Sequence, residues 1–314
     1  MSSNAPSLPD KPKSRRPFVL VAVLLVVVVA VVAIVLGTRG DDTTSTTAAG
    51  GEAKTVKIGV ADSSLPYWKV YTDLASQQLG VTVELVNFSD YSLPNPALSQ
   101  GEVDLNQFQH IQYLANYNVT AGDDLEPIGA TAIYPLPLYS TTAGSPEEIA
   151  QGSQVAIPND AINQARGLLV LQSAGLLTLK DGGNAFSTTS DIETAKVEVT
   201  AVDASQTANA LESGSVVAAI VNVNYATSAG LADDDVIFQD DPSAPSAAPY
   251  VNIFAARKDD IADETYLKLA ELFQDPAVQS SFAADYPNAV AKDTSPADLQ
   301  AELTEVQKDA EAAS

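Results

Sequence analysis

The 314-residue sequence contains no cysteine. Disulfides, thiol catalysis, thiolate metal sites and a lipid attached to an N-terminal cysteine are therefore excluded within these residues. Histidine is nearly as scarce, since His110 is the only one. A serine triad would have to use it, and no G-x-S-x-G, P-loop, H-E-x-x-H or EF-hand motif is present. These absences argue against an enzyme, and we expect neither a cofactor nor a metal ion.

Basic residues are also few. Sixteen lysines and arginines stand against 40 acidic residues, which gives a formal net charge of −24. A surface of this sign repels phosphate backbones and anionic lipids, so no nucleic acid partner is expected. Because acidic residues are so numerous, an exported hydrolase that uses two carboxylates remains an alternative. Most acids, however, occur in polar runs such as 233–235 and 240–241, which are typical of turns and solvated faces.

One long apolar run is present. Residues 18–36 carry no charge, and about 20 apolar residues suffice for a helix to cross a bilayer. Four basic residues precede the run and two aspartates follow it closely, so the positive-inside rule predicts that residues 1–17 are cytoplasmic. A cleaved signal peptide is the competing interpretation, but the run is long and no A-x-A site directly follows it. We expect an uncleaved anchor in the cell membrane and an extracytoplasmic domain.

Residues 37–53 are small and polar, which predicts a flexible linker. From residue 54 the pattern becomes that of an α/β protein. Alternating strands and helices predict largely parallel sheets covered on both faces. Strands are predicted at 55–61, 81–87, 154–157, 196–200, 216–221 and 251–255, and helices at 67–79, 159–174, 205–212 and 261–274.

Prolines interrupt the predicted strands in two places, at Pro135 and Pro137 and again within 242–249. Two such crossings, with about a hundred residues between them, predict one lobe inserted into another. Lobe 1 would comprise 54–134 and 251–314, and lobe 2 would comprise 135–250.

The segment 88–114 gathers aromatic residues around the histidine. We expect a strand-end loop followed by a helix whose first turn carries Phe108 and His110, because such loops hold ligands in open α/β sheets. Tyr91 and Tyr113 would complete a pocket wall. The alternative is that these rings form an ordinary core cluster.

Arginine is rare after residue 53, where only Arg166 and Arg257 occur. Arg166 falls about two turns into the predicted helix 159–174, which Asn159 or Asp160 can cap. Its planar guanidinium group can bind a carboxylate through two parallel hydrogen bonds. The simpler alternative is a surface arginine paired with a local acid.

Several stretches together resemble the NlpA/MetQ family of substrate-binding proteins, which serve methionine-uptake ABC transporters. They are VELVNFSDYSLPNPALSQGEVDLNQFQHIQYL, IYPLPLYS, VAIPNDAINQARGLLVLQSAGLLTLKDG, AAIVNVNYATSAGL and PYVNIFAAR. The resemblance runs from residue 54 to about 293. It implies a two-lobed periplasmic-binding-protein-like fold of type II. The implied ligand is L-methionine or a related amino acid or dipeptide, and the implied partners are an ABC permease and its ATPase subunit.

The resemblance also implies residue roles. Four residues would line the pocket for the ligand side chain, Arg166 would pair with the ligand carboxylate, and Asn222 and Asn252 would hold its amino and carboxylate groups. The implied ligand-binding set is Tyr91, Phe108, His110, Tyr113, Arg166, Asn222 and Asn252.

The chain departs from the family pattern in three places. It has no cysteine for acylation, Gln112 stands where proline is usual, and Asn224 stands where small hydroxyl residues also occur. These differences leave the ligand open. A membrane-anchored interaction or adhesion module that kept the fold without transport is the alternative function.

Overall fold

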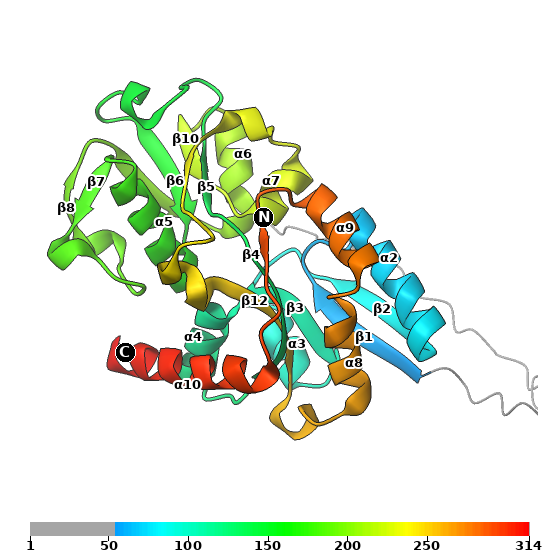
Figure 1. Ribbon diagram of the computed structural model, residues 1–314. Helices are drawn as coiled ribbons and strands as arrows, with labels where there is room; N and C mark the ends of the chain where they lie inside the picture. Colours follow the sequence, from blue (N-terminus) through cyan, green and yellow to red (C-terminus); the bar gives the residue numbers. More distant parts are fainter. Residues whose placement is uncertain (1–53, 314) are drawn as a thin grey trace, which may run out of the picture. The chain divides into compact units, whose positions relative to one another are not determined.

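The computed structural model describes residues 54–313 (Figure 1). The predicted cytoplasmic segment 1–17, transmembrane helix 18–36 and linker 37–53 lie outside the described residues. Between residues 54 and 313, no helix is both long enough and apolar enough to cross a membrane. The anchor therefore stays a prediction.

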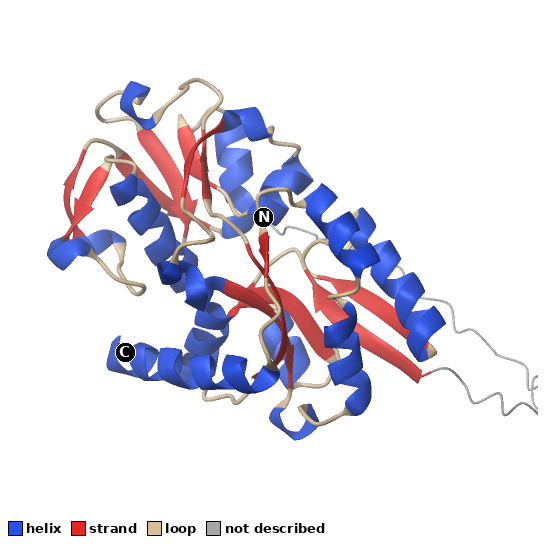
Figure 2. Cartoon of the chain, in the orientation of Figure 1, coloured by secondary structure: helices blue, strands red, loops and turns tan. Residues whose placement is uncertain are grey.

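Two β-sheets organise the described part of the chain (Figure 2). The first has the strand order β13-β4-β12-β3-β1-β2, and the second has the order β11-β5-β10-β6-β9. The first sheet consists of β1 (Lys54–Val60), β2 (Val81–Asn87), β3 (Leu105–His110), β4 (Glu126–Ile133), β12 (Val251–Ala256) and β13 (Val290–Ala291). The second consists of β5 (Pro137–Tyr139), β6 (Gln154–Pro158), β9 (Glu198–Val202), β10 (Ala218–Ile220) and β11 (Val236–Gln239), and a separate ribbon pairs β7 (Leu177–Leu179) with β8 (Ile192–Ala195).

Both sheets are mixed, so the prediction of largely parallel sheets is wrong. In the first sheet β1 runs parallel to β2 and β3, whereas β12 runs antiparallel to β3 and β4. In the second, β6 is parallel to β9 and β10, whereas β5 is antiparallel to β10 and β11. The reason is the route of the chain. Strand β4 leaves the first sheet toward the second and β12 returns from it, so the two neighbours run in opposite directions.

Lobe 1 denotes here the first sheet with the helices on its two faces. Successive residues of β12 point to opposite faces, so Phe254 lies in one hydrophobic core and Ile253 in the other. Helices α2 (Pro66–Leu74), α8 (Glu264–Leu272) and α9 (Pro276–Asp285) cover the first core, and α3 (Pro94–Ser99), α4 (Ile111–Ala121) and α10 (Pro296–Ala313) cover the second (Figure 1). A π-helical turn at Ala75–Leu79 extends α2.

Lobe 2 denotes the second sheet with its helices. Strand β10 again divides its side chains between two cores, with Ile220 on one face and Ala219 on the other. Helix α5 (Ala161–Ser173) packs on the first face, and α6 (Thr207–Glu212) and α7 (Val223–Ala229) pack on the second.

The chain passes between the two sheets twice. Residues 134–136 connect β4 to β5, and residues 240–250 connect β11 to β12. The two passages lie side by side, because Val251 pairs with Ile133. The cavity described below lies beside these two crossings.

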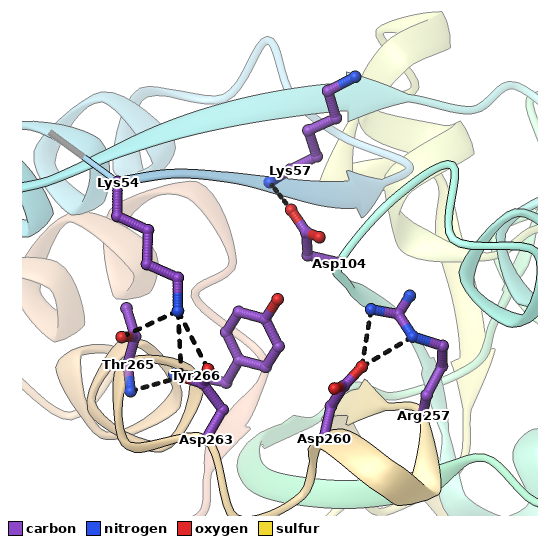
Figure 3. Close-up of polar contacts among 8 residues, drawn as sticks. All are labelled: Lys54, Lys57, Asp104, Arg257, Asp260, Asp263, Thr265 and Tyr266. Atoms are coloured by element: carbon purple, nitrogen blue, oxygen red, sulfur yellow. Dashed lines mark hydrogen bonds and ion pairs between the residues drawn. The ribbon is translucent and has the colours of Figure 1, made fainter. Parts of the chain in front are cut away.

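The amino-terminal end of β1 in the first sheet is held by polar contacts (Figure 3). Lys54, at the start of β1, places its Nζ 3.0 Å from Asp263 Oδ2 and 3.1 Å from Thr265 Oγ1. Asp263 also caps α8 by accepting hydrogen bonds from the backbone N–H groups of Thr265 and Tyr266. The first described strand is thus tied to α8 at the end that faces away from the cavity.

Candidate functional site

A cavity lies between the two lobes at the carboxyl ends of β1 and β3. It offers about 640 Å³ of unfilled space, part of which is open to solvent. All seven residues of the predicted set line it, namely Tyr91, Phe108, His110, Tyr113, Arg166, Asn222 and Asn252.

Aromatic rings form one end of the cavity. The ring centroid of Tyr91 lies 5.9 Å from that of Phe108 and 6.3 Å from that of Tyr113. Tyr225 of α7, in lobe 2, lies 4.9 Å from Tyr91 between ring centroids but does not line the cavity. Tyr91, Phe108 and Tyr113 are half-buried and belong to neither hydrophobic core of lobe 1. The structure therefore does not support the alternative of an ordinary core cluster.

His110 is not in a helix, and neither is Phe108. Both belong to β3, and His110 is the N-cap of α4, whose first residue is Ile111. The prediction of a helical first turn was wrong. Strand β3 buries polar side chains, so its sequence lacks the alternation of apolar and polar residues that identifies a strand. Asn106 and Gln109 of this strand bond to each other and to Asn95 in α3. This buried amide network holds the strand behind the cavity.

The protonation of His110 follows from its contacts. Its Nδ1 accepts a hydrogen bond from the Tyr113 backbone N–H at 3.1 Å, so the proton of the neutral ring is on Nε2. Burial, and then the charge of Arg166, lower the pKa of His110 to about 3. The ring is therefore neutral near pH 7. Nε2 is buried and makes no hydrogen bond of ordinary geometry among the described residues, although the side chain of Asn163 lies near enough to oppose the fall in the pKa of His110.

Arg166 lies at the other end of the cavity and is only 5% exposed. Asp160 caps its helix, as predicted, by accepting from the Asn163 backbone N–H. Arg166 Nε donates to Asp240 Oδ2 at 2.8 Å, and Nη2 donates to the Tyr134 carbonyl at 2.8 Å. The guanidinium carbon stacks 4.1 Å from the ring centroid of Tyr250. The alternative of a surface arginine is wrong, although an acid does pair with it.

Asp240 corrects a second expectation, since it is not simply a turn residue. Besides Arg166 it binds the backbone N–H of Leu136, at 2.7 Å. Sequence analysis missed it because its two partners lie 74 and 104 residues away. Arg166 lines the cavity, and its third guanidinium nitrogen, Nη1, has no hydrogen bond among residues 54–313.

The two predicted asparagines contact the same region. Asn222 precedes α7 and donates from Nδ2 to Asn163 Oδ1 at 3.1 Å, whereas its own buried Oδ1 has no partner in the described part of the chain. Asn252 pairs with His110 across β12 and β3, and its Nδ2 donates to the Tyr250 carbonyl. Asn163 was not predicted, although it stands one turn before Arg166 in the same motif.

Asp62 is a further wall residue that the sequence did not single out. Its carboxylate accepts hydrogen bonds from Trp68 Nε1 at 2.7 Å, Tyr286 Oη at 2.8 Å and Tyr67 Oη at 2.9 Å. Burial raises the pKa of Asp62, and these three donors oppose the rise. The cluster joins the end of β1 to α2 and α9.

The lobes also touch beyond the cavity. Tyr91 Oη of lobe 1 donates to Asn224 Oδ1 of lobe 2, and Tyr225 Oη donates to the Ser89 carbonyl at 3.1 Å. These contacts close the cavity on the side of the rings. The described conformation is thus one in which the two lobes meet.

The chemistry of the cavity is that of binding. Its wall holds the Arg166 guanidinium, three buried polar atoms without partners among the described residues, namely His110 Nε2, Asn222 Oδ1 and Asn224 Nδ2, and the rings of Tyr91, Phe108 and Tyr113. Buried polar atoms without partners are costly, so a ligand that satisfies them binds favourably. Among residues 54–313, no group of three or more acidic or histidine side chains could hold a metal ion.

Comparison with known proteins identifies relatives in sequence and in fold. The family model described as NlpA lipoprotein matches residues 56–294. The D-methionine-binding lipoprotein MetQ of Escherichia coli strain K12 is 37% identical over 228 residues, which cover 71% of this chain and 82% of that protein.

Two solved structures resemble the described fold. Protein PG110 from Staphylococcus aureus has a TM-score of 0.76 and 35% identity, covering 80% of this chain and 99% of that one. The substrate-binding protein of a methionine transporter from Streptococcus pneumoniae has a TM-score of 0.70 and 33% identity, covering 76% and 95%. The fold is thus the α/β two-lobed, periplasmic-binding-protein-like fold, and the chain belongs to the NlpA lipoprotein family.

Proposed function

We propose that this chain is the extracytoplasmic substrate-binding component of an ABC importer and that it captures L-methionine or a related amino acid or dipeptide. Relatives named for methionine binding and methionine transport support this proposal. The observation that carries it is the set of unpaired polar atoms beside a ring wall in one interlobe cavity. The predicted type II arrangement and lobe boundaries stay predictions.

An amino acid zwitterion matches the polar end of the cavity. Its carboxylate would accept hydrogen bonds from Arg166 Nη1 and from the neutral His110 Nε2, which supplies a donor without adding charge. Its ammonium would donate to Asn222 Oδ1. Asn252, opposite His110, lies where its amide can bind the same groups. Each buried charge of the ligand would then have a partner, as burial requires.

The side chain of the ligand would enter the ring end. Tyr91, Phe108 and Tyr113 present faces and edges to this space, and a thioether gains roughly 0.3–1.5 kcal/mol from each sulfur–aromatic contact. His110 would act as a wall and a donor rather than as a catalyst. We therefore propose that the protein is not an enzyme.

The ligand would be passed to an ABC permease driven by its ATPase subunit. Release requires the lobes to separate, and the contacts of Tyr91 and Tyr225 across the mouth are few enough to break. A module that had kept the fold without binding would not need three buried polar atoms without partners in the cavity wall, on His110, Asn222 and Asn224. The adhesion alternative is therefore not favoured.

Calorimetry on the full chain in mild detergent tests the ligand. L-methionine should bind with measurable heat and raise the melting temperature of the lobes, since a ligand that binds only the folded state stabilises it. D-methionine and glycyl-methionine, titrated in parallel, would assign the preferred form. No heat and no thermal shift with any of these compounds would refute the ligand assignment.

A matched pair of variants tests the carboxylate site. Arg166→Lys keeps a positive charge but cannot bond Asp240, Tyr134 and the ligand together, so affinity should fall at least tenfold. Arg257→Lys makes the same change at the other arginine, whose contacts to Leu98 and Val103 lie outside the cavity. It should leave affinity unchanged. Equal affinities for the two variants would place the carboxylate elsewhere.

We further propose that residues 18–36 anchor the protein in the cell membrane, with residues 1–17 in the cytoplasm. The support is the uninterrupted apolar run and the absence of cysteine from the 314 residues, which excludes thioether lipidation within them. The protein should stay in the membrane fraction after alkaline extraction, and deletion of 1–53 should release it. A mature protein that begins after residue 36 would instead indicate cleavage.

A further inference from the structure

A second cavity lies between the lobes, next to the cavity described above. It holds about 470 Å³ of unfilled space, part of which is open to solvent. Tyr134, Pro135, Val223 and Tyr286 line both cavities and so separate one from the other. Lobe 1 contributes residues 285–289 to the second cavity, and lobe 2 contributes residues of β5, α7 and β11. The second cavity therefore has one wall on each lobe.

The charge of this second cavity is negative. The charged residues that line it are Asp285, at the end of α9, and Asp233, just before β11. Asp285 Oδ2 accepts a hydrogen bond from the Tyr67 backbone N–H at 3.0 Å. Neither aspartate forms an ion pair within residues 54–313. The two opposite walls thus each carry a carboxylate that no lysine or arginine of the described chain contacts.

Tyrosine rings form much of the remaining lining. Tyr134 and Tyr286 pack edge to face, with ring centroids 5.0 Å apart and an interplanar angle of 85°. The hydroxyl of Tyr286 donates to Asp62, which fixes the position of its ring. Tyr139 of β5 adds a third ring from lobe 2. Organic cations are attracted to tyrosine faces within about 6 Å of the ring centroid, so this lining suits a positive charge.

Tyr139 gives an independent indication of a ligand. It is only 4% exposed and lines the second cavity, and its hydroxyl makes no hydrogen bond among the residues that the structure describes. Burial, and then the charges of Asp233 and Asp235, raise the pKa of Tyr139 to about 12, so the hydroxyl stays protonated near pH 7. A polar group left in this way is unfavourable unless a partner completes it. The hydroxyl oxygen can accept from an N–H donor in the cavity.

We propose that the second cavity is a binding site for a small, free organic cation that carries a guanidinium or alkylammonium group. Asp233 and Asp285 would offset its charge, Tyr134 and Tyr286 would contact it with their rings, and the Tyr139 hydroxyl would accept one of its N–H groups. Because the walls belong to different lobes, an occupant favours the conformation in which the lobes meet. A metal ion fits less well, since no group of three or more acidic or histidine side chains in 54–313 could hold one.

Two compounds of nearly the same shape test the need for charge. Methylguanidinium is a cation, whereas N-methylurea is neutral. Calorimetry on the full chain in mild detergent, at about 0.15 M salt to screen the acidic surface, should show saturable binding of methylguanidinium alone. Acetyl-glycyl-arginyl-glycinamide presents the same group as a protein segment would. Binding of this peptide without binding of methylguanidinium would overturn a site for a free cation.

A pair of neighbouring aspartates tests the place of binding. Asp233→Asn removes one charge from the cavity at an exposed position, and affinity for methylguanidinium should fall roughly fivefold or more. Asp234→Asn is the matched control, because Asp234 is exposed in the same turn but does not line the cavity. It should leave the affinity nearly unchanged. Equal losses in the two variants would mean that only the general surface charge attracts the cation, which would overturn the site.

The hydroxyl of Tyr139 is tested with a second cation. Tyr139→Phe keeps the ring and removes only the acceptor. Tetramethylammonium has no N–H group to donate, so its affinity should not change, whereas that of methylguanidinium should fall. An equal effect on both cations, or no effect on either, would overturn the assignment of the hydroxyl as an acceptor.

L-methionine measures the link to closure. Saturating methylguanidinium should lower the dissociation constant of methionine about threefold or more, and methionine should tighten methylguanidinium by the same factor, because such coupling is reciprocal. An unchanged methionine affinity would overturn this link. The tests with the cations alone do not require methionine to bind, so failure of the proposed function would leave them intact. Absence of saturable methylguanidinium binding would overturn the inference and leave the proposed function standing.

Discussion

Asp240 binds Arg166 and Leu136 at once, with Oδ2 accepting from the guanidinium Nε at 2.8 Å and Oδ1 accepting from the Leu136 backbone at 2.7 Å. Arg166 in turn donates to the carbonyl of Tyr134. Residues 134–136 form one passage between the sheets and Asp240 begins the other. One arginine of lobe 2 is therefore held by both passages, beside the place where the ligand carboxylate is proposed to bind.

Replacement of Asp240 should destabilise the empty protein more than the liganded one. Asp240→Ala leaves the buried guanidinium without its anion, at a cost of about 2–4 kcal/mol, because Asp240 is itself partly exposed. A bound carboxylate would supply the missing charge. Urea unfolding with and without L-methionine measures both effects. Asp241→Ala, at the exposed neighbouring position, is the control, and a loss of stability as large as that of Asp240→Ala would contradict the prediction.

His110 should make the protein less stable as the pH falls. Its pKa is about 3 in the folded protein and about 6.5 when unfolded, so between these values only the unfolded chain takes up the proton. Stability is lost as the pH falls below about 6.5, by about 2 kcal/mol at pH 5. His110→Asn removes this titration and keeps an acceptor for the Tyr113 N–H. Unfolding at pH 7 and pH 5 should show the smaller loss in the variant. Equal losses would mean that the histidine is not buried as described.

Asp62 should be important for stability. Asp62→Ala would leave three buried donors, on Tyr67, Trp68 and Tyr286, without an acceptor, and about 2–4 kcal/mol should be lost. The fluorescence of Trp68, the only tryptophan, should change in the folded variant because its indole N–H loses its partner. Asp73→Ala on the exposed side of α2 removes only a surface ion pair with Lys69 and should have little effect. A similar loss in both variants would argue against the buried cluster.

Gly129 should not tolerate a side chain. A Cβ atom there would lie 2.7 Å from the Cβ of Ala270, because α8 packs directly on β4 at this point. Gly129→Ala should therefore cost about 1–3 kcal/mol through overpacking. Gly144→Ala is the control, since its Cβ would meet nothing closer than 3.5 Å. Thermal unfolding compares the two, and an unchanged Gly129→Ala would show that the helix can move away.

Part of lobe 1 and of lobe 2 was predicted from local sequence patterns. The β-branched runs 81–87 and 251–255 are strands β2 and β12, and the helix predicted to be capped by Asn159 or Asp160 is α5 with Asp160 as its cap. These elements follow from side-chain period and capping, which involve residues close in sequence. Strand β3 was mistaken for a helix because its buried amides find partners in α3, so that polarity did not indicate exposure.

The candidate site was predicted only in part. Resemblance to a family pointed to seven residues that line one cavity, but it did not indicate Asp240, Asn163 or Asp62. The direction of the sheets was also missed, because it depends on where the chain returns rather than on any one segment.

The sequence by itself determined the absence of cysteine chemistry within these residues, the acidic charge, the apolar run at 18–36 and some of the strands and helices, since these depend on composition and on neighbouring residues. Only the tertiary structure decided which polar groups are paired. Arg166 meets Asp240 across 74 residues, and Tyr91 meets Asn224 across 133. Contacts at such separations depend on how two lobes pack around two chain crossings, and no single segment of the sequence records that packing.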